Sequence, residues 1–379
     1  MIYWRLSGFY LFYFASLGIL VPYWGLYLKS QGFSITQIGQ LIAILMATKI
    51  VAPNIWGWIA DLTGHRMTIV RSAALLAALC FLGVFAGSGF WWLALIMFAF
   101  SFFWNAALPQ FEATTMNHLG AATHRYSGIR LWGSVGFILA VAALGPLLDT
   151  FGTEHLPPVL AVVFMLIWVS SLLVPESAAG HLALDQQRLR DVLRRPVVLA
   201  LFTVCFLVQA SHGPYYAFYS IYLESHGYST GLIGQLWALG VIAEIGIFLV
   251  MPRLLPRFGA RRLLLAAVTL TTLRWLLIAG FADRLALMLF AQTLHAASFG
   301  LYHAVAIHLV HHLFTGAHQG RGQALYSSIS FGAGGAVGSL ASGYLWSGVG
   351  AQSMYLLAAA VSLAAVVVVL TGMRARDLP

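Results

Sequence analysis

The chain has 379 residues, of which 60% are hydrophobic and only 8% are charged, and its mean hydropathy is +0.86. A soluble domain is about one-quarter charged, so this composition excludes an ordinary soluble enzyme and favours an all-α polytopic membrane protein. At about 20 apolar residues per span, the chain has room for about twelve transmembrane helices and for no soluble catalytic domain.

Twelve apolar segments, separated by short polar connections, are the predicted spans. Their approximate ranges are 5–28, 38–60, 67–87, 90–117, 123–148, 156–175, 196–223, 232–255, 262–281, 285–313, 321–347 and 350–373. The first is too long for the apolar region of a signal peptide and lacks a cleavage pattern, so we expect it to be the first transmembrane helix. The longest polar stretch predicts a cytoplasmic linker at 176–195, between an N-terminal six-helix bundle at 1–175 and a C-terminal one at 196–379.

Basic residues lie mostly on one side of these spans. The 15 on that side are Arg5, Arg66, Arg71, Arg125, Arg188, Arg190, Arg194, Arg195, Arg253, Arg257, Arg261, Arg262, Arg321, Arg374 and Arg376. Only Lys29 and Arg284 lie on the other side, so the positive-inside rule places both termini and the linker in the cytoplasm of a bacterial-type inner membrane. We therefore expect the lipid bilayer, and no nucleic acid, as the partner of the basic residues.

The chain contains an internal repeat at an offset of 195 residues. Residues 27–41 align with residues 222–236, and more than half of the fifteen positions are identical. The register continues without a gap through Gly64 over Gly259. Chance similarity between apolar helices would not keep the loops aligned. We expect two pseudo-symmetric halves of the same topology, as in transporters whose two bundles rock about a central site.

The loop after the second predicted span carries ordered glycines and charges. It reads Gly57-Trp-Ile-Ala-Asp61-Leu-Thr-Gly64-His-Arg66, and a degenerate copy ending at Arg261 follows the eighth span. Glycines permit a tight turn and close helix approach, and Asp61 and Arg66 can hydrogen-bond to helix ends at a cytoplasmic gate. This motif resembles that of the major facilitator superfamily. The resemblance implies the superfamily fold, with twelve helices in two six-helix bundles, and secondary transport.

Five charged residues lie inside predicted spans: Lys49, Glu112, Arg130, Glu244 and Arg274. A charge at the bilayer centre costs about 3 kcal/mol unless it is paired or solvated. Pairs that only hold helices together are an alternative, but five such charges favour an aqueous central cavity. Glu112 and Arg130 are each nine residues from Ala121, near the turn of a helical hairpin, which puts them at equal depth. There they can pair with each other or bind a solute.

The segment Ile129-Arg130-Leu-Trp-Gly133-Ser-Val-Gly136-Phe137 resembles the fifth helix of the oligosaccharide:proton symporter family, which includes lactose permease. Glu112 precedes Arg130 by the spacing of that family. The resemblance implies that Glu112 and Arg130 bind substrate hydroxyl groups and that Phe137 stacks on a sugar ring.

In the second half, Arg274 and His295 match the proton-coupling and binding cluster of the same family. The carboxylate expected one turn beyond the histidine is Ser298 here, so a coupled proton must be carried elsewhere. Glu244 is our candidate, because a glutamate that moves between an apolar environment and the neighbourhood of Arg274 can bind and release a proton. His295 and His303 lie two turns apart on one helix face and can share that proton, although hydrogen bonding with a purely structural role is an alternative for each.

A closer resemblance is to the phenylpropionate permease family, and it covers essentially the whole chain. Residues 209–222 (Gln-Ala-Ser-His-Gly-Pro-Tyr-Tyr-Ala-Phe-Tyr-Ser-Ile-Tyr) and 236–244 (Leu-Trp-Ala-Leu-Gly-Val-Ile-Ala-Glu) resemble its seventh and eighth helices. The pairs Arg274-Trp275 and Leu294-His295 continue the match. The resemblance implies proton-driven uptake of an aromatic carboxylic acid.

An aromatic carboxylate requires one cation and an apolar pocket lined by aromatic rings. Lys49 or Arg130 can supply the cation. The other substrate-binding candidates lie in the second half and are Gln209, Tyr215, Tyr219 and Trp237. Aromatic residues also pack between helices, which is the alternative for these rings. A sugar would instead use polar side chains such as Glu112 and Gln209.

The eleventh predicted span is rich in glycine. Its glycines are Gly332, Gly334, Gly335 and Gly338. We expect them to permit close contact with a neighbouring helix while two rigid bundles move. Cross-linking the extracytoplasmic ends of the first and seventh spans is then expected to abolish transport.

These patterns predict a secondary active transporter, specifically a proton-coupled symporter of an aromatic carboxylate such as 3-phenylpropionate. A sugar or nucleoside proton symporter is one alternative, and an exporter of amphipathic compounds is another. No enzyme is expected, because no nucleophile with its base lies within a span. His308, His311 and His312 lack a carboxylate partner, and Cys80 and Cys205 lie in apolar runs, so we expect neither a metal site nor a disulfide. The expected driving force is the proton gradient without a cofactor, and the expected state is a monomer.

Overall fold

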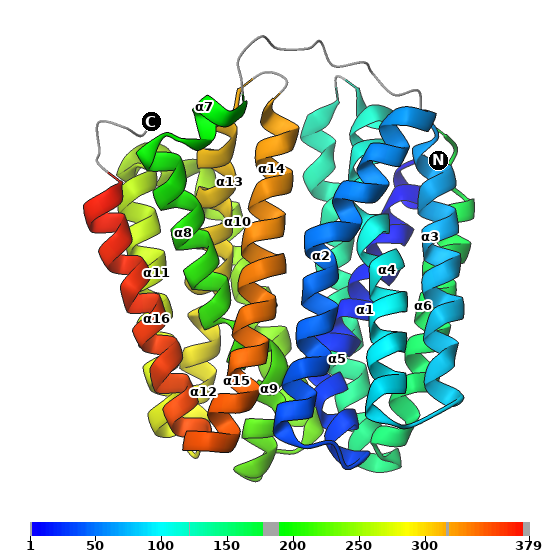
Figure 1. Ribbon diagram of the computed structural model, residues 1–379, viewed down its shortest axis with the longest axis vertical. Helices are drawn as coiled ribbons and strands as arrows, with labels where there is room; N and C mark the ends of the chain where they lie inside the picture. The colour runs from blue at the N-terminus through cyan, green and yellow to red at the C-terminus, as the bar shows by residue number, and fades with distance from the viewer. Residues whose placement is uncertain (1, 121, 177–188, 316–317, 374–379) are drawn as a thin grey trace. The chain divides into compact units, whose positions relative to one another are not determined.

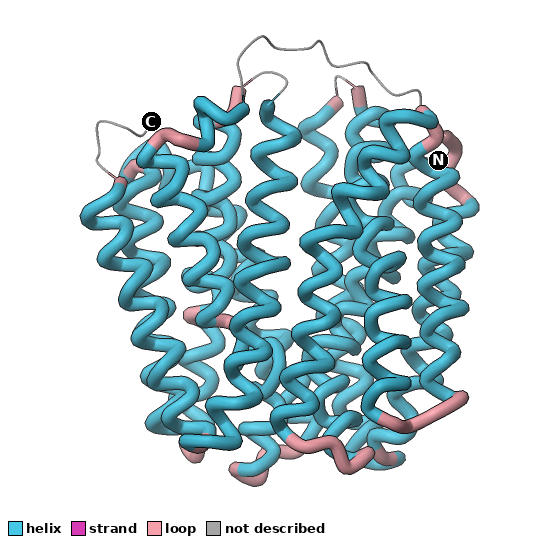
Figure 2. The backbone as a smooth tube through the Cα atoms, viewed as in Figure 1, coloured by secondary structure: helices cyan, strands magenta, loops and turns pink. Residues whose placement is uncertain are grey.

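The computed structural model describes residues 2–120, 122–176, 189–315 and 318–373. Within these ranges the backbone forms helices joined by short loops, without a strand (Figure 2). Eleven of the helical segments described are long and apolar enough to cross a membrane. The predicted all-α polytopic architecture is therefore confirmed. Arg188, Arg374 and Arg376, which the charge pattern assigned to the basic side, lie outside the described residues.

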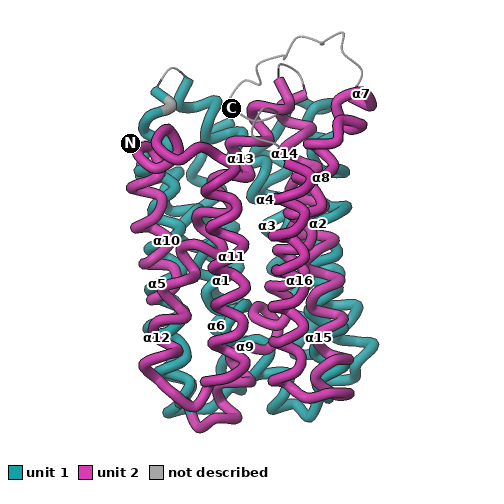
Figure 3. The backbone as a smooth tube through the Cα atoms, turned by 90° about the vertical axis from the view of Figure 1, so that its left-hand side faces the viewer, with its two compact units in different colours: residues 1–181, 228–238 teal, residues 182–227, 239–379 magenta. Residues whose placement is uncertain are grey.

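Contacts between residues divide the chain into two compact units (Figure 3). Unit 1 comprises Met1–His181 and Tyr228–Ala238, and unit 2 comprises Leu182–Gly227 and Leu239–Pro379. Of the predicted linker at 176–195, residues 177–188 lie outside the described residues. The linker and the two predicted bundle boundaries therefore stay predictions.

The helices of the first half are connected by short loops and form an antiparallel bundle (Figure 1). They are α1 (Ile2–Ser30), α2 (Ile35–Thr63), α3 (Arg66–Phe81), α4 (Phe90–Leu119), α5 (Tyr126–Phe151) and α6 (Leu156–Leu172), with the short 3-10 segments η1 (Leu82–Phe85), η2 (Thr123–Arg125) and η3 (Thr153–His155). Helix α1 packs against α5 and α6, and α4 packs against α2 and α3. Gly18 and Gly136 allow the backbones of α1 and α5 to touch, because a Cβ atom at Gly18 would lie 2.7 Å from the carbonyl oxygen of Phe137.

The helices of the second half begin with the short α7 (Leu189–Leu193). They continue with α8 (Pro196–Ser211), α9 (Gly213–Ser225), α10 (Thr230–Phe258), α11 (Ala260–Phe281), α12 (Leu285–Thr293), the π-helical η4 (Ala296–Leu301), α13 (Tyr302–Leu313), α14 (Gln319–Ser327), the π-helical η6 (Ser328–Gly334), α15 (Gly335–Val349) and α16 (Ala351–Gly372). Helix α16 packs against α8 and α11, and α15 packs against α9.

The predicted span at 321–347 corresponds to α14, η6 and α15, which follow one another without a loop. Its many glycine and serine residues make it less apolar than the other spans. Gly334 and Gly338 lie against the backbone of α8, so the expected close contact of this helix with a neighbour is confirmed.

Three spans of unit 2 depart from regular α-helix. The seventh predicted span is broken between α8 and α9 at His212, because Pro214 has no N–H to continue the helical hydrogen bonds. Gly213 at this break touches Gly338 of α15. The π-helical segments η4 and η6 interrupt two further spans, and such segments occur frequently at functional sites.

The internal repeat is visible in the loop geometry. Gly32 and Gly227, which are 195 residues apart, have φ angles of 84° and 82°. Gly64 and Gly259, at the same offset, have φ angles of 71° and 74°. These left-handed conformations favour glycine, so the two halves retain glycine at the same turns for the same steric reason.

Candidate functional site

In unit 1, Glu112 of α4 and Arg130 of α5 form an ion pair. The Nε atom of Arg130 lies 3.7 Å from Oε1 of Glu112, and the two side chains are 31% and 32% exposed, respectively. The hydroxyl of Tyr126 donates a hydrogen bond to the same oxygen of Glu112 at 3.4 Å. The structure thus brings together the two residues that the hairpin spacing placed at equal depth. Tyr126 was not predicted, although it precedes Arg130 by four residues and therefore shares its helix face.

The guanidinium of Arg130 lies among aromatic rings. Its Cζ atom is 3.8 Å from the ring centroid of Phe14 and 5.6 Å from that of Tyr10, both on α1. Gly133 leaves room for this arrangement, because a Cβ atom there would lie 2.8 Å from both Arg130 and Phe14. A guanidinium carries five N–H donors, and none of them reaches an acceptor among the described residues within hydrogen-bond distance. Arg130 is thus a half-buried cation on an aromatic platform with donors left for a solute.

Two further candidates of unit 1 have less defined surroundings. Lys49 of α2 is half-buried and makes no ion pair with any residue that the structure describes. Phe137 of α5 is half-buried, and its backbone contacts Gly18 of α1. The substrate-binding roles of both residues stay predictions.

In unit 2, Arg274 of α11 is fully buried, and four of its five N–H donors have acceptors within the unit. Its Nε donates to the carbonyl oxygen of Ala291 at 3.0 Å, and its Nη2 donates to Oε1 of Gln292 at 2.7 Å. Its Nη1 donates to Oγ of Ser298 at 2.9 Å and lies 3.0 Å from Nδ1 of His295. Ser298, at the position where the sequence resemblance led us to expect a carboxylate, is therefore a neutral acceptor for Arg274.

His295 links Arg274 to Glu244 of α10. Because a guanidinium can only donate, Nδ1 of His295 must accept, and the single proton of the neutral ring is then on Nε2. Nε2 lies 3.7 Å from Oε2 of Glu244, whose side chain is 16% exposed. The structure therefore joins three predicted proton-coupling residues in one chain of contacts, from Glu244 through His295 to Arg274.

His303 of α13 lies beyond an aromatic ring from His295. The ring of Phe299 stacks between the two histidines, with its centroid 5.5 Å from that of His295 and 5.7 Å from that of His303. Nδ1 of His303 instead lies 2.8 Å from the hydroxyl of Tyr326. Direct sharing of a proton between His295 and His303 does not fit this geometry, because an apolar ring separates them.

The aromatic candidates of α9 are buried in unit 2. The rings of Tyr215 and Tyr219 are 4.9 Å apart, and the hydroxyl of Tyr215 donates to Oε1 of Gln292 at 3.3 Å. The guanidinium of Arg274 lies 4.1 Å from the ring centroid of Tyr215. Trp237 is also buried, but it belongs to the part of α10 that groups with unit 1.

Several side chains in unit 2 hold polar atoms that are buried without a partner among the described residues. They include Oε1 and Nε2 of Gln209, Nε2 of His212 and Nε2 of Gln292. His212 was not predicted, although it lies one helical turn from Gln209. Its Nδ1 lies 2.8 Å from the carbonyl oxygen of Val208, to which it must donate, so its Nε2 is an acceptor. Buried amides in this state are able to pair with a polar solute or with water.

The predicted gate motif connects three helices of unit 1. Arg66 donates from Nη2 to Oδ1 of Asp61 at 2.6 Å and from Nη1 to Oε1 of Gln110 in α4 at 2.7 Å. Gly64 ends α2 in a left-handed conformation, and its N–H donates to the carbonyl oxygen of Ala60. A Cβ atom at Gly57 would lie 3.5 Å from Nε2 of Gln110. The motif therefore fixes the start of α3 against α2 and α4, and its gating role stays a prediction.

The second copy of the motif makes different contacts. Arg261 donates from Nη2 to the carbonyl oxygen of Leu370 at 3.2 Å and from Nε to that of Met373, at the end of α16. In the first half the comparable contact is made by Arg71, whose Nη2 donates to the carbonyl oxygen of Val174 at 2.7 Å. The repeat thus conserves the turn, while the charge pair of Asp61 and Arg66 belongs to the first half.

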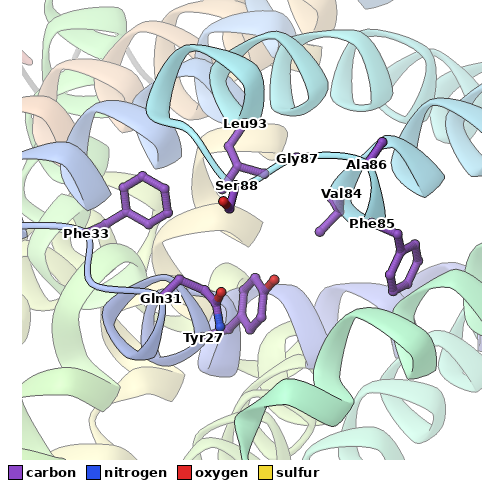
Figure 4. A pocket seen from close by; sticks show the side chains of 9 residues that line it. All are labelled: Tyr27, Gln31, Phe33, Val84, Phe85, Ala86, Gly87, Ser88 and Leu93. Carbon is purple, nitrogen blue, oxygen red and sulfur yellow. The ribbon is translucent and has the colours of Figure 1, made fainter.

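A cavity of about 270 Å³ lies in unit 1 where the connection between α1 and α2 meets the connection between η1 and α4 (Figure 4). Its lining includes Tyr27, Gln31, Phe33, Phe85 and Ser88. None of the predicted substrate-binding residues lines it, so it is separate from the candidate site.

Apolar helices of spanning length, with charged residues that meet inside the units, are the features of a solute transporter of the membrane. The chain is 29% identical over 368 residues to an Escherichia coli (strain K12) protein named "Probable 3-phenylpropionic acid transporter", with 94% of each chain covered. It is 28% identical over 378 residues to the maltose permease of Geobacillus stearothermophilus, with 96% of this chain and 92% of the relative covered.

A model of the MFS_1 like family matches residues 3–357, so the chain belongs to this family of the major facilitator superfamily. The crystal structure of the nucleoside transporter NupG superimposes with a TM-score of 0.81 over 98% of this chain and 99% of that chain, at 16% identity. The likeness to NupG shows the fold alone. The protein is therefore a multi-pass membrane transporter of small molecules with the major facilitator fold, and not an enzyme.

Proposed function

We propose that this protein is a proton-coupled symporter of a small aromatic carboxylate such as 3-phenylpropionate. We further propose that it is a monomer of the bacterial inner membrane with both termini in the cytoplasm. The observation that carries the substrate proposal is the guanidinium of Arg130, which lies 3.8 Å from the ring centroid of Phe14 with donors left for a solute.

A carboxylate requires hydrogen-bond donors, whereas a phenyl ring requires apolar contacts. The surroundings of Arg130 offer both. The guanidinium can donate two parallel hydrogen bonds to a carboxylate, while Phe14 and Tyr10 offer apolar ring faces beside it. Glu112 lies 3.7 Å from Nε of Arg130, which is longer than a hydrogen bond, so it offsets the positive charge without occupying the donors.

Proton coupling is supported by the contacts of Glu244 with His295 and of His295 with Arg274. If His295 gains a second proton, both of its ring nitrogens become donors, and its contact with Arg274 is lost. A proton that arrives at Glu244 or His295 therefore changes the hydrogen bonds of Arg274, which also reach Gln292 of α12. In this way a protonation event can change the packing of α10, α11 and α12.

A sugar or nucleoside symporter is the second candidate, and one observation favours it. The side chains of Gln209 and Gln292 are buried with amide atoms that have no partner among the described residues. Hydroxyl groups of a sugar or a nucleoside would pair with such amides, whereas a phenyl ring would not. The maltose permease relative supports this candidate as well.

Uptake driven by a pH jump in proteoliposomes distinguishes the candidates. Labelled 3-phenylpropionate, maltose, lactose and uridine are compared in the wild type and in Arg130→Met, with Arg253→Met as the control. Loss of a charge-assisted hydrogen bond costs about 1.5–3 kcal/mol, so we expect KM for 3-phenylpropionate to rise roughly 10- to 100-fold in Arg130→Met only. Unchanged uptake of 3-phenylpropionate in Arg130→Met would refute the aromatic carboxylate. Uptake of maltose, lactose or uridine alone would establish the second candidate.

A further inference from the structure

The first turn of α10 is capped by a residue from another helix. The backbone N–H of Thr230 donates to Oδ1 of Asp149 at 2.7 Å, and that of Gly231 donates to Oδ2 at 2.8 Å. Asp149 lies near the end of α5, and all three residues belong to unit 1. The first N–H groups of a helix have no partner within the helix, and a carboxylate is the acceptor that they bind best.

The internal repeat allows the caps of the two matching helices, α2 and α10, to be compared. In the first half, α2 begins with a capping box of its own, in which Ser34 and Gln37 bond to each other's backbone N–H groups. The residue that matches Gln37 at the offset of 195 is Leu232, which has no acceptor in its side chain. Ser229 still accepts from the N–H of Leu232 at 3.2 Å, but the other half of the box is missing. Asp149 of α5 instead accepts from two other N–H groups of the same first turn, those of Thr230 and Gly231.

Glycines bring the two helices close enough for this contact. A Cβ atom at Gly231 would lie 2.9 Å from Oδ2 of Asp149, and one at Gly145 of α5 would lie 2.7 Å from the carbonyl oxygen of Thr230. One turn further along α10, Gly234 touches the carbonyl oxygen of Val141, to which Tyr23 donates. The first two turns of α10 therefore lie directly on the backbone of α5. Val141, at this contact, is fully buried.

Helix α10 belongs to both units, because its residues up to Ala238 group with unit 1 and those from Leu239 group with unit 2. It runs without interruption from Thr230 to Phe258. If the two units move relative to each other during transport, either α10 bends near residue 238 or its first turns separate from α5. Gly240 lies close to the ring of His295, so the helix just beyond residue 238 is held in the packing of unit 2.

We propose that Asp149 is a latch that holds the first turn of α10 on α5 in one conformation and releases it in every transport cycle. A cap that is borrowed from another helix is lost when the helices separate, whereas the cap of α2 moves with its own helix. Asp149 thus stabilises only the conformation in which the first turn of α10 lies on α5. The proposal depends on transport, which the family establishes, and not on the proposed solute.

The latch is tested by the reactivity of a thiol placed beneath it. The reporter is Val141→Cys in a chain that also carries Cys80→Ala and Cys205→Ala, and the measurement is its rate of labelling by N-ethylmaleimide in membranes. We expect Asp149→Asn to raise this rate about tenfold. Gly231→Ala changes the α10 side of the same contact and is also expected to raise the labelling rate. Gly246→Ala, in the same helix with no atom near its added Cβ, is the control.

A second substitution separates the latch from a simple helix cap. Leu232→Gln restores the capping box that α2 has, so in the Asp149→Asn protein it should recover thermal stability but leave the labelling rate high. The proposal is overturned if Asp149→Asn leaves labelling unchanged, or if Leu232→Gln returns it to the wild-type rate.

Locking the contact tests its role in the cycle. In the Cys80→Ala and Cys205→Ala background, the pair Asp149→Cys and Thr230→Cys is joined by a short thiol cross-linker, and uptake of 3-phenylpropionate is expected to stop and to return on reduction. The pair Ser30→Cys and Thr153→Cys is the control, because these hydroxyls are 2.9 Å apart within unit 1. Full uptake by the cross-linked latch pair would overturn the proposal. If the wild type takes up no 3-phenylpropionate, the proposed solute fails, and the labelling experiment still decides about the latch.

Discussion

Two arginines inside the membrane-spanning helices have different surroundings and therefore differ in their ability to donate hydrogen bonds to a ligand. Arg274 is fully buried, and four of its five N–H donors have acceptors within unit 2. Arg130 is half-buried, and its Nε lies 3.7 Å from Oε1 of Glu112, beyond hydrogen-bond distance. A guanidinium whose donors are mostly used within the protein orients its neighbours, whereas one with available donors can bind a ligand. The geometry therefore supports a structural and coupling role for Arg274 and a substrate-binding role for Arg130.

At the residue scale, Glu244→Gln tests proton coupling. The amide retains the shape of the side chain but cannot bind or release a proton, so we expect accumulation driven by a pH gradient to be lost while exchange of solute across the membrane continues. The measurement compares gradient-driven uptake with exchange in proteoliposomes. Glu224→Gln, at an exposed position near the end of α9, is the control. Gradient-driven accumulation that survives in Glu244→Gln would rule out Glu244 as the proton carrier.

At the scale of helices, glycine determines which pairs approach most closely. Gly136 of α5 lies against the carbonyl of Leu11 in α1, and Gly338 of α15 lies against that of Ala210 in α8. In both contacts the neighbour is backbone, which cannot move aside as a flexible side chain can. Glycine is common at such helix contacts in membrane proteins because it permits van der Waals packing between backbones.

Gly338→Ala tests this packing. The added Cβ atom would collide with the backbone at Ala210, so we expect the free energy of unfolding to fall by about 1–3 kcal/mol. Gly348→Ala lies in the same helix with no atom near the added Cβ and should have no comparable effect. Thermal unfolding in detergent compares the two variants. Equal stability of both variants and the wild type would show that α15 and α8 are less tightly packed than the structure indicates.

At the scale of the whole molecule, the charge distribution predicts which loops face the cytoplasm. Ser88, before α4, and His65, before α3, are both exposed. In a chain with Cys80→Ala and Cys205→Ala, we expect an impermeant maleimide to label Ser88→Cys in intact cells. His65→Cys should react only after the membrane is permeabilised, because the basic loops stay in the cytoplasm. The opposite labelling pattern would invert the proposed topology.

Much of the fold was determined by local properties of the sequence. Spans and loops follow from hydropathy, because a bilayer requires long apolar helices. The repeat follows from glycines such as Gly64 and Gly259, whose left-handed turns tolerate few other residues. The pairing of Glu112 with Arg130 could also be predicted, because one short hairpin connects their helices and residue counts alone set their depth.

The tertiary structure decided how these side chains are used, because each use depends on residues far apart in the chain. The number of hydrogen bonds made within the protein distinguishes Arg274 from Arg130, and no local sequence pattern records it. Phe299 separates His295 from His303, although their spacing alone suggested a shared proton. The cap that Asp149 provides to α10 joins residues that are 81 positions apart. Helical periodicity shows which side chains share a face, but only the packing of helices shows what that face meets.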